Sequence, residues 1–383
     1  MDCLAIVIVT FKRQELLGRL FDSIAELTVA PWRVVVVDNE NSPKTARMVA
    51  DFSARLLAQW GETGSEPDSA GGTARVVYDP QETNTGGSGG FSEGVRRAFE
   101  LGAEWFWVMD DDVAVLPEAL ERLEPWSARY DVVQGQRYDY DGTPFFWQHH
   151  FMTSLCIYNP LSRAGFNGAD HIDVNVMCFE GGLFRRRVVE RIGLPDYRFF
   201  IYYDDATYGY LASKVCQPVL VPDYVLRRTR EVPHQEVGAS GVRQISSTSD
   251  MTRYYIMRNR GYMARYFMLH GDYNPVGYGF GTFLSFAKEF LRLVLVDRGH
   301  FGPSWARLWA GYRDSKKALH DPAWEPMPPL GEATALFEKH PARSTRCHSH
   351  LPTRSLSWRR RARLRPSARP ACHPRGGRCP PPC

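Results

Sequence analysis

The chain has 383 residues, of which 44% are hydrophobic and 23% are charged, a composition that excludes a disordered or collagen-like protein and supplies apolar surface for one or two packed cores. Residues 331–383 carry 12 Lys and Arg against 2 Glu, so the formal net charge of +4 becomes −6 when only residues 1–330 are counted. A mildly acidic body does not favour a phosphate-backbone binder, and we expect no nucleic-acid partner.

Hydropathy and the amino-terminal residues bear on the cellular location of the protein. No segment reaches the roughly 18 consecutive apolar residues that a membrane-spanning helix needs, and the amino-terminal segment lacks the basic region and cleavage site of a secretory signal. We therefore predict a cytoplasmic protein. Residues 331–383 are rich in Arg, Pro and Cys and lack apolar periodicity, so we expect a disordered tail. Its abrupt composition suggests a non-native extension.

Strand-like and helix-like segments alternate over the first 110 residues. Short apolar runs rich in β-branched or aromatic residues predict strands, and apolar residues at helical spacing predict helices. The predicted strands cover residues 4–11, 33–37, 75–78 and 105–109, and the predicted helices cover 16–27, 44–58 and 91–101. This alternation predicts an α/β fold with an open, mostly parallel sheet, whose ligand site lies at the carboxyl ends of the strands. The polar segments 10–13, 38–39, 84–90 and 110–112 all follow such ends.

Three consecutive aspartates, Asp110, Asp111 and Asp112, follow the fourth predicted strand. Adjacent carboxylates repel one another, and a bound cation offsets that repulsion. Asp110 and Asp112 point to the same side of an extended backbone, and hard oxygen ligands suit Mg²⁺ or Mn²⁺. The alternative is a solvated acidic turn that caps the next helix.

The segment 84–94, NTGGSGGFSEG, is interpreted as a glycine-rich loop that opens a helix. Its bare amides could approach a diphosphate or sugar hydroxyls, although it matches neither a Walker loop nor the dinucleotide fingerprint. A flexible turn is the alternative. Asp38 could accept hydrogen bonds from a uracil or ribose or be an ordinary turn residue, and Arg13 could face a base or solvate the first helix.

Carboxylates in the second half follow aromatic runs. Glu180 lies in FEGGLF, and Asp204 and Asp205 end FFIYYDD. Burial there could raise a carboxylate pKa, which makes Asp205 or Asp204 a candidate general base; the alternative is helix capping. His234 is a candidate metal ligand, although a lone histidine is more often structural.

The order of VTFKR, VVDNENS, NTGGSGGFSEG, WVMDDD, FEGGLF, YYDDATYG and RYYIMRNR resembles glycosyltransferase family two. Within that family the combination is most similar to bacterial galactofuranosyltransferases, over about residues 4–265. The resemblance implies a GT-A fold, a UDP-sugar donor, a divalent metal and inversion at the anomeric carbon. It also implies a catalytic domain over residues 1–265, with a donor half before about residue 115, followed by a helical region over 266–330.

The resemblance assigns roles to individual residues. The expected donor-binding residues are Thr10, Arg13, Asp38, Asn84, Gly86, Gly87, Asp110 and Asp111. Asp110, Asp112 and His234 would hold Mn²⁺ or Mg²⁺. Asp205 would be the base, and the expected acceptor-binding residues are Trp147, Glu180, Gly181, Gly182 and Asp204. The element Arg258 to Arg260 matches a basic element near the donor phosphates, and an exposed helix face is its alternative.

The acceptor implied by the resemblance is a rhamnosyl-GlcNAc disaccharide on polyprenyl diphosphate, which takes galactofuranose from UDP-galactofuranose in cell-wall galactan synthesis. The segments 282–296 and 305–312 have the pattern of amphipathic helices with interfacial aromatics, suited to the inner membrane surface. Packing on the catalytic domain, or on another subunit in a homo-oligomer, is the alternative. A dTDP-rhamnose-dependent rhamnosyltransferase and a non-catalytic nucleotide-sugar-binding protein are the competing functions.

Overall fold

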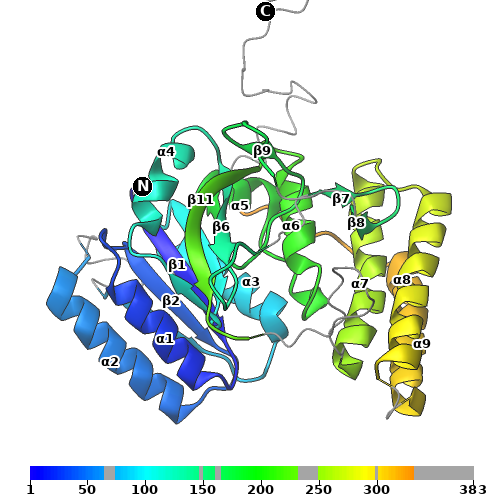
Figure 1. Cartoon of the computed structure of the whole chain (residues 1–383), viewed down its shortest axis with the longest axis horizontal. Coiled ribbons are helices and arrows are strands. Elements are labelled where there is room, and N and C mark those ends of the chain that lie inside the picture. The colour runs from blue at the N-terminus through cyan, green and yellow to red at the C-terminus, as the bar shows by residue number, and fades with distance from the viewer. Residues whose placement is uncertain (64–73, 146–149, 160–164, 232–248, 298–300, 332–383) are drawn as a thin grey trace, which may run out of the picture. The chain divides into compact units, whose positions relative to one another are not determined.

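A computed structural model describes residues 1–63, 74–145, 150–159, 165–231, 249–297 and 301–331 (Figure 1). The chain divides into a unit of Met1–Ser344 and a second unit, Thr345–Cys383, which lies outside the described residues, as does nearly all of the tail expected at 331–383. The following description concerns the first unit.

A mixed, mostly parallel sheet forms the centre of this unit. Its order is β3-β2-β1-β4-β10-β6-β11-β5, with β9 paired to β11. The strands are β1 Leu4–Thr10, β2 Arg33–Asp38, β3 Val76–Pro80, β4 Trp105–Asp110, β5 Val113–Val115, β6 Val132–Tyr138, β9 Ile172–Asp173, β10 Gly182–Arg185 and β11 Val219–Arg228. A separate hairpin pairs β7 Phe151–Met152 with β8 Ile157–Tyr158. The four strands predicted from the first 110 residues are confirmed as β1 to β4, which are mutually parallel in the order β3-β2-β1-β4.

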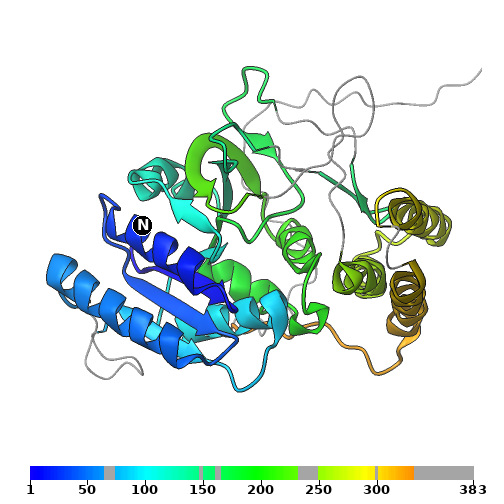
Figure 2. The ribbon, with the colours of Figure 1, turned by 60° about the horizontal axis from the view of Figure 1, so that its bottom comes forward.

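Helices cover both faces of the sheet. The apolar side chains of α1 Gln14–Ala25, α2 Pro43–Trp60 and α4 Ala119–Ser127 pack on one face. Those of α3 Gly86–Glu100, α5 Arg186–Ile192 and α6 Asp204–Ala212 pack on the other. Figure 2 shows α1 and α2 side by side along the sheet. Every residue of β1 is buried, as expected for a parallel strand covered on both faces.

The glycine-rich segment was expected to be a loop, and that interpretation is wrong for most of it, because α3 begins at Gly86. A Cβ atom at Gly94 would lie 2.4 Å from Val7 Cγ1, and one at Gly90 would lie 2.5 Å from Val9 Cγ1. Real Cβ atoms do not approach other carbon atoms so closely. These glycines therefore allow a helix to pack tightly on β1, rather than giving a loop freedom to bend.

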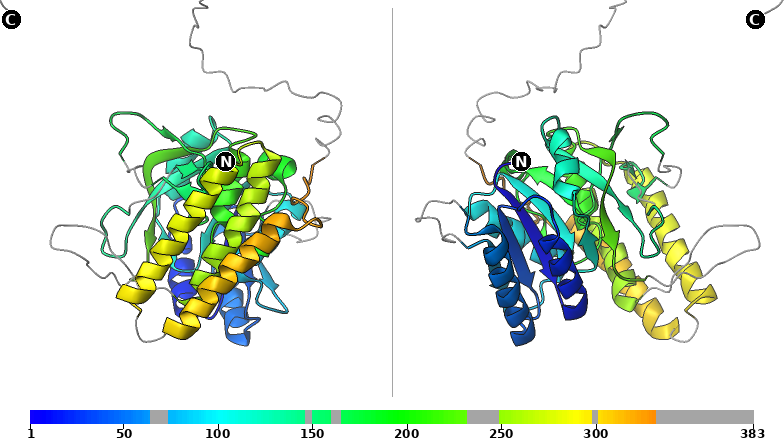
Figure 3. Two further views of the ribbon diagram at one scale, coloured as in Figure 1. Left: turned by 90° about the vertical axis from the view of Figure 1, so that its right-hand side faces the viewer. Right: turned by 60° about the vertical axis from the view of Figure 1, so that its left-hand side comes forward.

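Three long helices follow the sheet: α7 Asp250–Leu269, α8 Pro275–Leu295 and α9 Phe301–His320. Figure 3 (left) faces them, and α7 packs against both α8 and α9. The helical region expected after the sheet is thus confirmed, although the boundary expected at residue 265 falls inside α7. No helix among the described residues is long and apolar enough to cross a membrane.

Candidate active site

The carboxyl ends of β2, β1 and β4 lie next to one another, because these strands are adjacent and parallel. Thr10 pairs in register with Asp38, and Val9 pairs with Asp110. The strand ends therefore meet at this edge, as expected from the sequence, and they bring together residues that lie far apart in the chain, such as Val9 and Asp110.

Asp111 connects the side chains that meet at these strand ends. Its carboxylate accepts hydrogen bonds from Thr10 Oγ1 at 2.7 Å and from the Arg13 guanidinium at 3.1 Å. Arg13 also donates to Asp112 at 3.2 Å. Burial raises the pKa of Asp111, against the opposing charge of Arg13. Thr10 and Arg13, both expected to bind the donor, thus contact Asp111 directly, and Asp111 is buried rather than solvated.

The ionised form of Asp110 is disfavoured by its surroundings. Burial raises its pKa well above the usual value, and Asp112, Glu180 and Asp111 raise it further. Its side chain makes no hydrogen bond or ion pair with the described residues. A buried carboxylate in a negative field, close to a second carboxylate on Asp112, is the donor chemistry that a hard divalent cation prefers. Asp110 and Asp112 therefore fit the expected metal.

The expected third ligand, His234, lies outside the described residues, as does Trp147 from the expected acceptor side. Among the described residues, no group of three or more His, Cys, Asp or Glu side chains is arranged to hold a metal ion. The set expected from the sequence thus has two members in the described part of the site.

Glu180 connects the acidic cluster to the other half of the site. Its carboxylate pairs with Arg137 at 3.1 Å and with Arg228 at 3.0 Å. Burial raises the pKa of Glu180, but these two cations outweigh burial and the net shift is downward. Glu180 is therefore a fixed negative charge. It raises the pKa values of both Asp112 and Asp205, so the acidic cluster and the candidate base face the same carboxylate.

Asp205 has the properties of a general base poised near neutral pH. Burial and the neighbouring Asp204 carboxylate raise its pKa to about 7, against hydrogen bonds from the Ala206 amide (2.7 Å) and the Cys178 thiol. Burial also raises the pKa of Asp204 to about 6. For Asp205 the Asp204 carboxylate adds to the effect of burial, because two neighbouring carboxylates cannot both ionise without cost. A base whose pKa lies near the working pH is the most efficient.

The backbone that leads to Asp205 is strained. Phe200, Tyr202 and Tyr203 have φ values of 63°, 70° and 67°, in the left-handed region that bulky residues rarely adopt. We call residues 199–203 the aspartate loop. Such a conformation persists only where the surroundings hold it in place.

Helix α7 holds the aspartate loop. The fully buried Asn259 side chain donates to the carbonyls of Phe199 (3.1 Å), Ile201 (2.7 Å) and Tyr202 (2.8 Å). Arg258 donates to the carbonyl of Phe199 as well, at 2.7 Å. The idea that Arg258 to Arg260 form an exposed helix face is therefore wrong, because Asn259 and Arg260 have no exposed surface.

Helix α3 holds the same loop from the opposite side. The Ser88 amide donates to the Phe200 carbonyl at 3.0 Å, and a Cβ atom at Gly86 would lie 2.1 Å from that oxygen. Gly86 is thus needed for close approach to the aspartate loop. Gly87 has open space around its Cβ position, which is compatible with the expected approach of a donor.

The other residues expected to bind the donor have local structural partners. Asp38 is fully buried and accepts from the amides of Glu40 and Ser42 and from the Tyr78 hydroxyl, at 2.8–2.9 Å. The exposed Asn84 accepts from the Gly86 amide at 2.9 Å. Asp38 stabilises the turn after β2, and Asn84 stabilises the turn before α3. Of the two side chains, only Asn84 has surface available to a ligand.

The expected acceptor glycines also have packing roles. Gly181 has a φ of 92°, and a Cβ atom there would lie 2.4 Å from Leu226 Cδ1. At Gly182 the corresponding distance to the Met177 methyl group is 2.5 Å. They allow the chain to turn tightly behind Glu180 and thereby fix the place of that carboxylate.

Sequence reasoning assigned no individual role to four residues that organise this site: Asn39, Arg137, Arg228 and Asn259. Asn39 is buried and donates to the Gly86 carbonyl at 2.9 Å, which joins β2 to the start of α3. Arg137 offered no clear signal, because its strand, VVQGQRY, mixes apolar and polar residues. Asn259 offered none, because an asparagine within a helix has no pattern that indicates distant carbonyls.

Residues 5–193 match the model of the family Glycosyl transferase family 2. These residues form a family 2 glycosyltransferase domain. The match includes the acidic cluster and Glu180, and it ends before Asp204, Asp205 and the three long helices. The open sheet with helices on both faces agrees with the GT-A fold expected from the resemblance.

Two curated relatives extend the comparison. The chain is 28% identical over 212 residues to galactofuranosyltransferase GlfT1 of Mycolicibacterium smegmatis, covering 52% of this chain and 61% of that protein. It is 27% identical over 211 residues to galactofuranosyltransferase GlfT1 of Mycobacterium tuberculosis, covering 52% and 60%. The matched region thus spans about three fifths of the length of these relatives.

Solved structures with a related arrangement include S. aureus TarS. Its 1–349 fragment in complex with UDP gives a TM-score of 0.48 at 12% identity, covering 83% of this chain and 81% of that one. A longer TarS structure gives a TM-score of 0.49 at 15% identity, covering 83% and 49%.

Proposed function

We propose that this protein is an inverting, metal-dependent galactofuranosyltransferase. It would move galactofuranose from UDP-galactofuranose to a rhamnosyl-GlcNAc acceptor on polyprenyl diphosphate at the inner membrane surface, in cell-wall galactan synthesis. The family domain and the two relatives named galactofuranosyltransferase support the sugar. The single observation that supports the catalytic mechanism is the environment of Asp205. Its pKa is about 7, and the same Glu180 carboxylate acts on Asp205 and on Asp112 of the acidic cluster.

In the proposed reaction, Asp205 accepts the proton of an acceptor hydroxyl as that oxygen bonds to the anomeric carbon. A hydroxyl is a weak nucleophile at neutral pH, so a positioned base contributes about 10²–10⁴-fold to the rate. Attack from the side opposite the leaving UDP inverts the anomeric configuration and needs no covalent intermediate. The proton that Asp205 gains removes the repulsion between its carboxylate and those of Asp204 and Glu180.

On the donor side, Thr10 and Arg13 hold Asp111, and this arrangement fixes the direction of the neighbouring Asp110 and Asp112 carboxylates. Those two carboxylates would hold Mn²⁺ or Mg²⁺, with His234 as the proposed third ligand. The bound cation would neutralise charge on the departing diphosphate. The open space at Gly87 and the exposed Asn84 would receive the nucleotide side of the donor.

A donor screen tests this function. Purified protein is given Mn²⁺ or Mg²⁺, a synthetic lipid-linked disaccharide and either UDP-galactofuranose or dTDP-rhamnose, and the product is identified by mass spectrometry and by the anomeric coupling in NMR. We expect galactofuranose transfer with inversion. Transfer only from dTDP-rhamnose would show that the protein is a rhamnosyltransferase. Absence of transfer from any nucleotide sugar would contradict the enzymatic function.

A further inference from the structure

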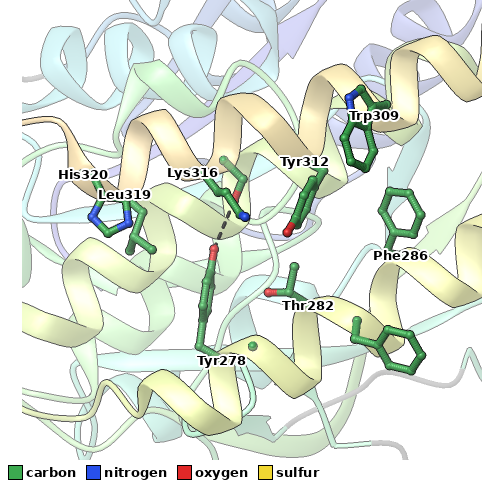
Figure 4. Close-up of a pocket in the computed structure, with 11 residues that line it drawn as sticks. Tyr278, Thr282, Phe286, Trp309, Tyr312, Lys316, Leu319 and His320 are labelled. Carbon is green, nitrogen blue, oxygen red and sulfur yellow. Dashed lines mark hydrogen bonds between the residues drawn. The ribbon is translucent and has the colours of Figure 1, made fainter.

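A pocket of 650 Å³ lies between α8 and α9, away from the strand ends that carry the acidic cluster. Figure 4 shows Trp309, Tyr312 and Lys316 on α9 facing Tyr278, Thr282 and Phe286 on α8 across this space. Gly279, Phe283, Ser315, Leu319 and His320 complete the lining. Aromatic rings dominate the wall, and polar groups are few, as in sites that take an apolar chain.

One layer of side chains connects this pocket with the aspartate loop. Thr282, in the pocket wall, accepts from the fully buried Arg260 guanidinium at 3.2–3.3 Å. Arg260 directly follows Asn259 on α7, and the Asn259 side chain donates to the carbonyls of the aspartate loop. The pocket is therefore the neighbour of the loop that carries the candidate base.

The surface that leads to the pocket is apolar along the whole of α8. Val276 is 82% exposed, Phe283 64%, Leu291 54% and Leu295 55%, and on α9 Trp309 is 49% exposed. Contiguous exposure of large apolar side chains is unusual for a surface that faces only water.

The charge of these two helices is positive, with six Lys and Arg against two Asp and Glu. Both acids are already paired: the buried Glu289 with Arg292, and Asp314 with Lys317 at 2.9 Å. Lys316 makes no ion pair with the described residues and lies over the Tyr312 ring at 4.7 Å from its centre. An unpaired ammonium at an apolar aromatic pocket complements a ligand that joins an apolar chain to an anionic group.

We propose that the pocket between α8 and α9 binds the apolar chain of an anionic, lipid-linked acceptor, with Lys316 beside its charged group. The proposal rests on the proposed function for the identity of this lipid as substrate. It places the recognition of the lipid on helices outside the family domain, one side-chain layer from the aspartate loop. Bulk membrane phospholipid is the competing occupant.

Gly279→Leu tests the proposal, because Gly279 lines the pocket and a Cβ atom there meets nothing within 4 Å, so that a leucine side chain can occupy pocket volume. The full chain is assayed with the lipid-linked disaccharide and with the same disaccharide on a short water-soluble aglycone. We expect the KM for the lipid-linked acceptor to rise about tenfold or more, since several buried CH₂ contacts are lost. The KM for the soluble acceptor is expected to stay unchanged. Gly302→Leu is the matched control, because Gly302 on α9 also has open space around its Cβ position and does not line the pocket.

Calorimetry separates a failure of this proposal from a failure of the proposed function. Dodecyl phosphate is expected to bind the wild-type chain more tightly than dodecyltrimethylammonium, and Lys316→Met is expected to abolish that preference, whereas Lys317→Met is not. If Gly279→Leu leaves both KM values unchanged, or alters only the binding of phospholipid vesicles, the acceptor site is elsewhere. If the wild type transfers sugar to neither acceptor, the proposed function fails, while dodecyl phosphate binding still reports on the pocket.

Discussion

The Asn259 side chain offers a sharp test of how the catalytic carboxylate is positioned. Its amide group donates to three carbonyls of the aspartate loop, yet it carries only two hydrogen atoms. Asn259→Ala therefore removes about two hydrogen bonds to the loop, while Arg258 still donates to the Phe199 carbonyl, at a cost of about 2–3 kcal/mol in the free energy of unfolding. A domain of ordinary stability remains folded after such a loss.

The larger effect is expected on catalysis. Three residues of the aspartate loop have positive φ values, and the loop ends two residues before Asp205, so loss of the amide allows the loop to relax and displaces the carboxylate. A displacement of about 1 Å from the reactive geometry costs about 100-fold in rate. We expect kcat to fall by this order, while the KM for the nucleotide sugar changes little.

The assay is release of UDP under saturating substrates, with thermal unfolding measured in parallel. Asn274→Ala is the matched control, because Asn274 caps α8 through the Gly277 amide at 2.8 Å and does not touch the aspartate loop. It is expected to cost about 1 kcal/mol in stability and to leave kcat unchanged. Asn259→Asp, which keeps the shape but presents oxygens to the carbonyls, is expected to be at least as inactive as Asn259→Ala. A stable Asn259→Ala variant with wild-type kcat would refute the positioning argument.

Three further outcomes are expected. Because burial and the Asp204 charge raise the pKa of Asp205 to about 7, kcat/KM should rise with pH through about 7, and Asp204→Asn should move this rise to lower pH. Asp110→Asn should raise the metal concentration needed for half-maximal activity and should increase the free energy of unfolding without metal at neutral pH, because burial opposes the ionised carboxylate. Gly94→Ala should lower the free energy of unfolding by about 1–3 kcal/mol, because its methyl group would meet Val7 at 2.4 Å.

Each of these has a result that would contradict it. If the pH profile of Asp204→Asn equals that of the wild type, the rise of kcat/KM with pH does not reflect the ionisation of Asp205. An Asp110→Asn variant with unchanged metal response would remove Asp110 from the metal site. Gly87→Ala is the control for Gly94→Ala in chemical denaturation, since its Cβ position is open and alanine favours a helix more than glycine does. Equal destabilisation of both variants would show that contact with β1 is not the cause.

Stability should also depend on pH through Asp205. Its folded-state pKa of about 7 lies above the unfolded value of 3.8, so the folded state retains a proton that the unfolded chain releases. The contribution of Asp205 to stability is therefore fully present below about pH 4 and is lost as the pH rises through about 7. Asp205→Asn should accordingly be more stable than the wild type at pH 8, a comparison that guanidinium denaturation can make directly.

Local patterns in the sequence were sufficient for the donor half of the fold. A fully buried strand such as β1 leaves a continuous apolar run, and each strand end is followed by polar residues that the parallel sheet brings together. The glycines of α3 were misjudged because composition does not tell flexibility from close packing. Only the position of Val7 and Val9 opposite Gly94 and Gly90 shows that these glycines are needed for contact.

The second half of the site depends on long-range contacts that local patterns do not carry. Asp205 could be nominated from the aromatic run before it, but its support from Asn259 joins residues more than 50 positions apart. The pairing of Glu180 with Arg137 and Arg228 likewise joins three different strands or their ends. Such partners become visible only when the chain is folded, because many polar residues at other positions have the same local appearance.

The most direct test of the proposed chemistry is the Asp205→Asn exchange in the full chain, with donor binding and transfer measured on the same preparation. If Asp205 is the base, kcat falls by about 10²–10⁴-fold while the Kd for the nucleotide sugar in the presence of Mn²⁺ stays within about twofold of the wild type. A variant that binds the donor normally and transfers sugar at the wild-type rate would show that the proton is accepted elsewhere.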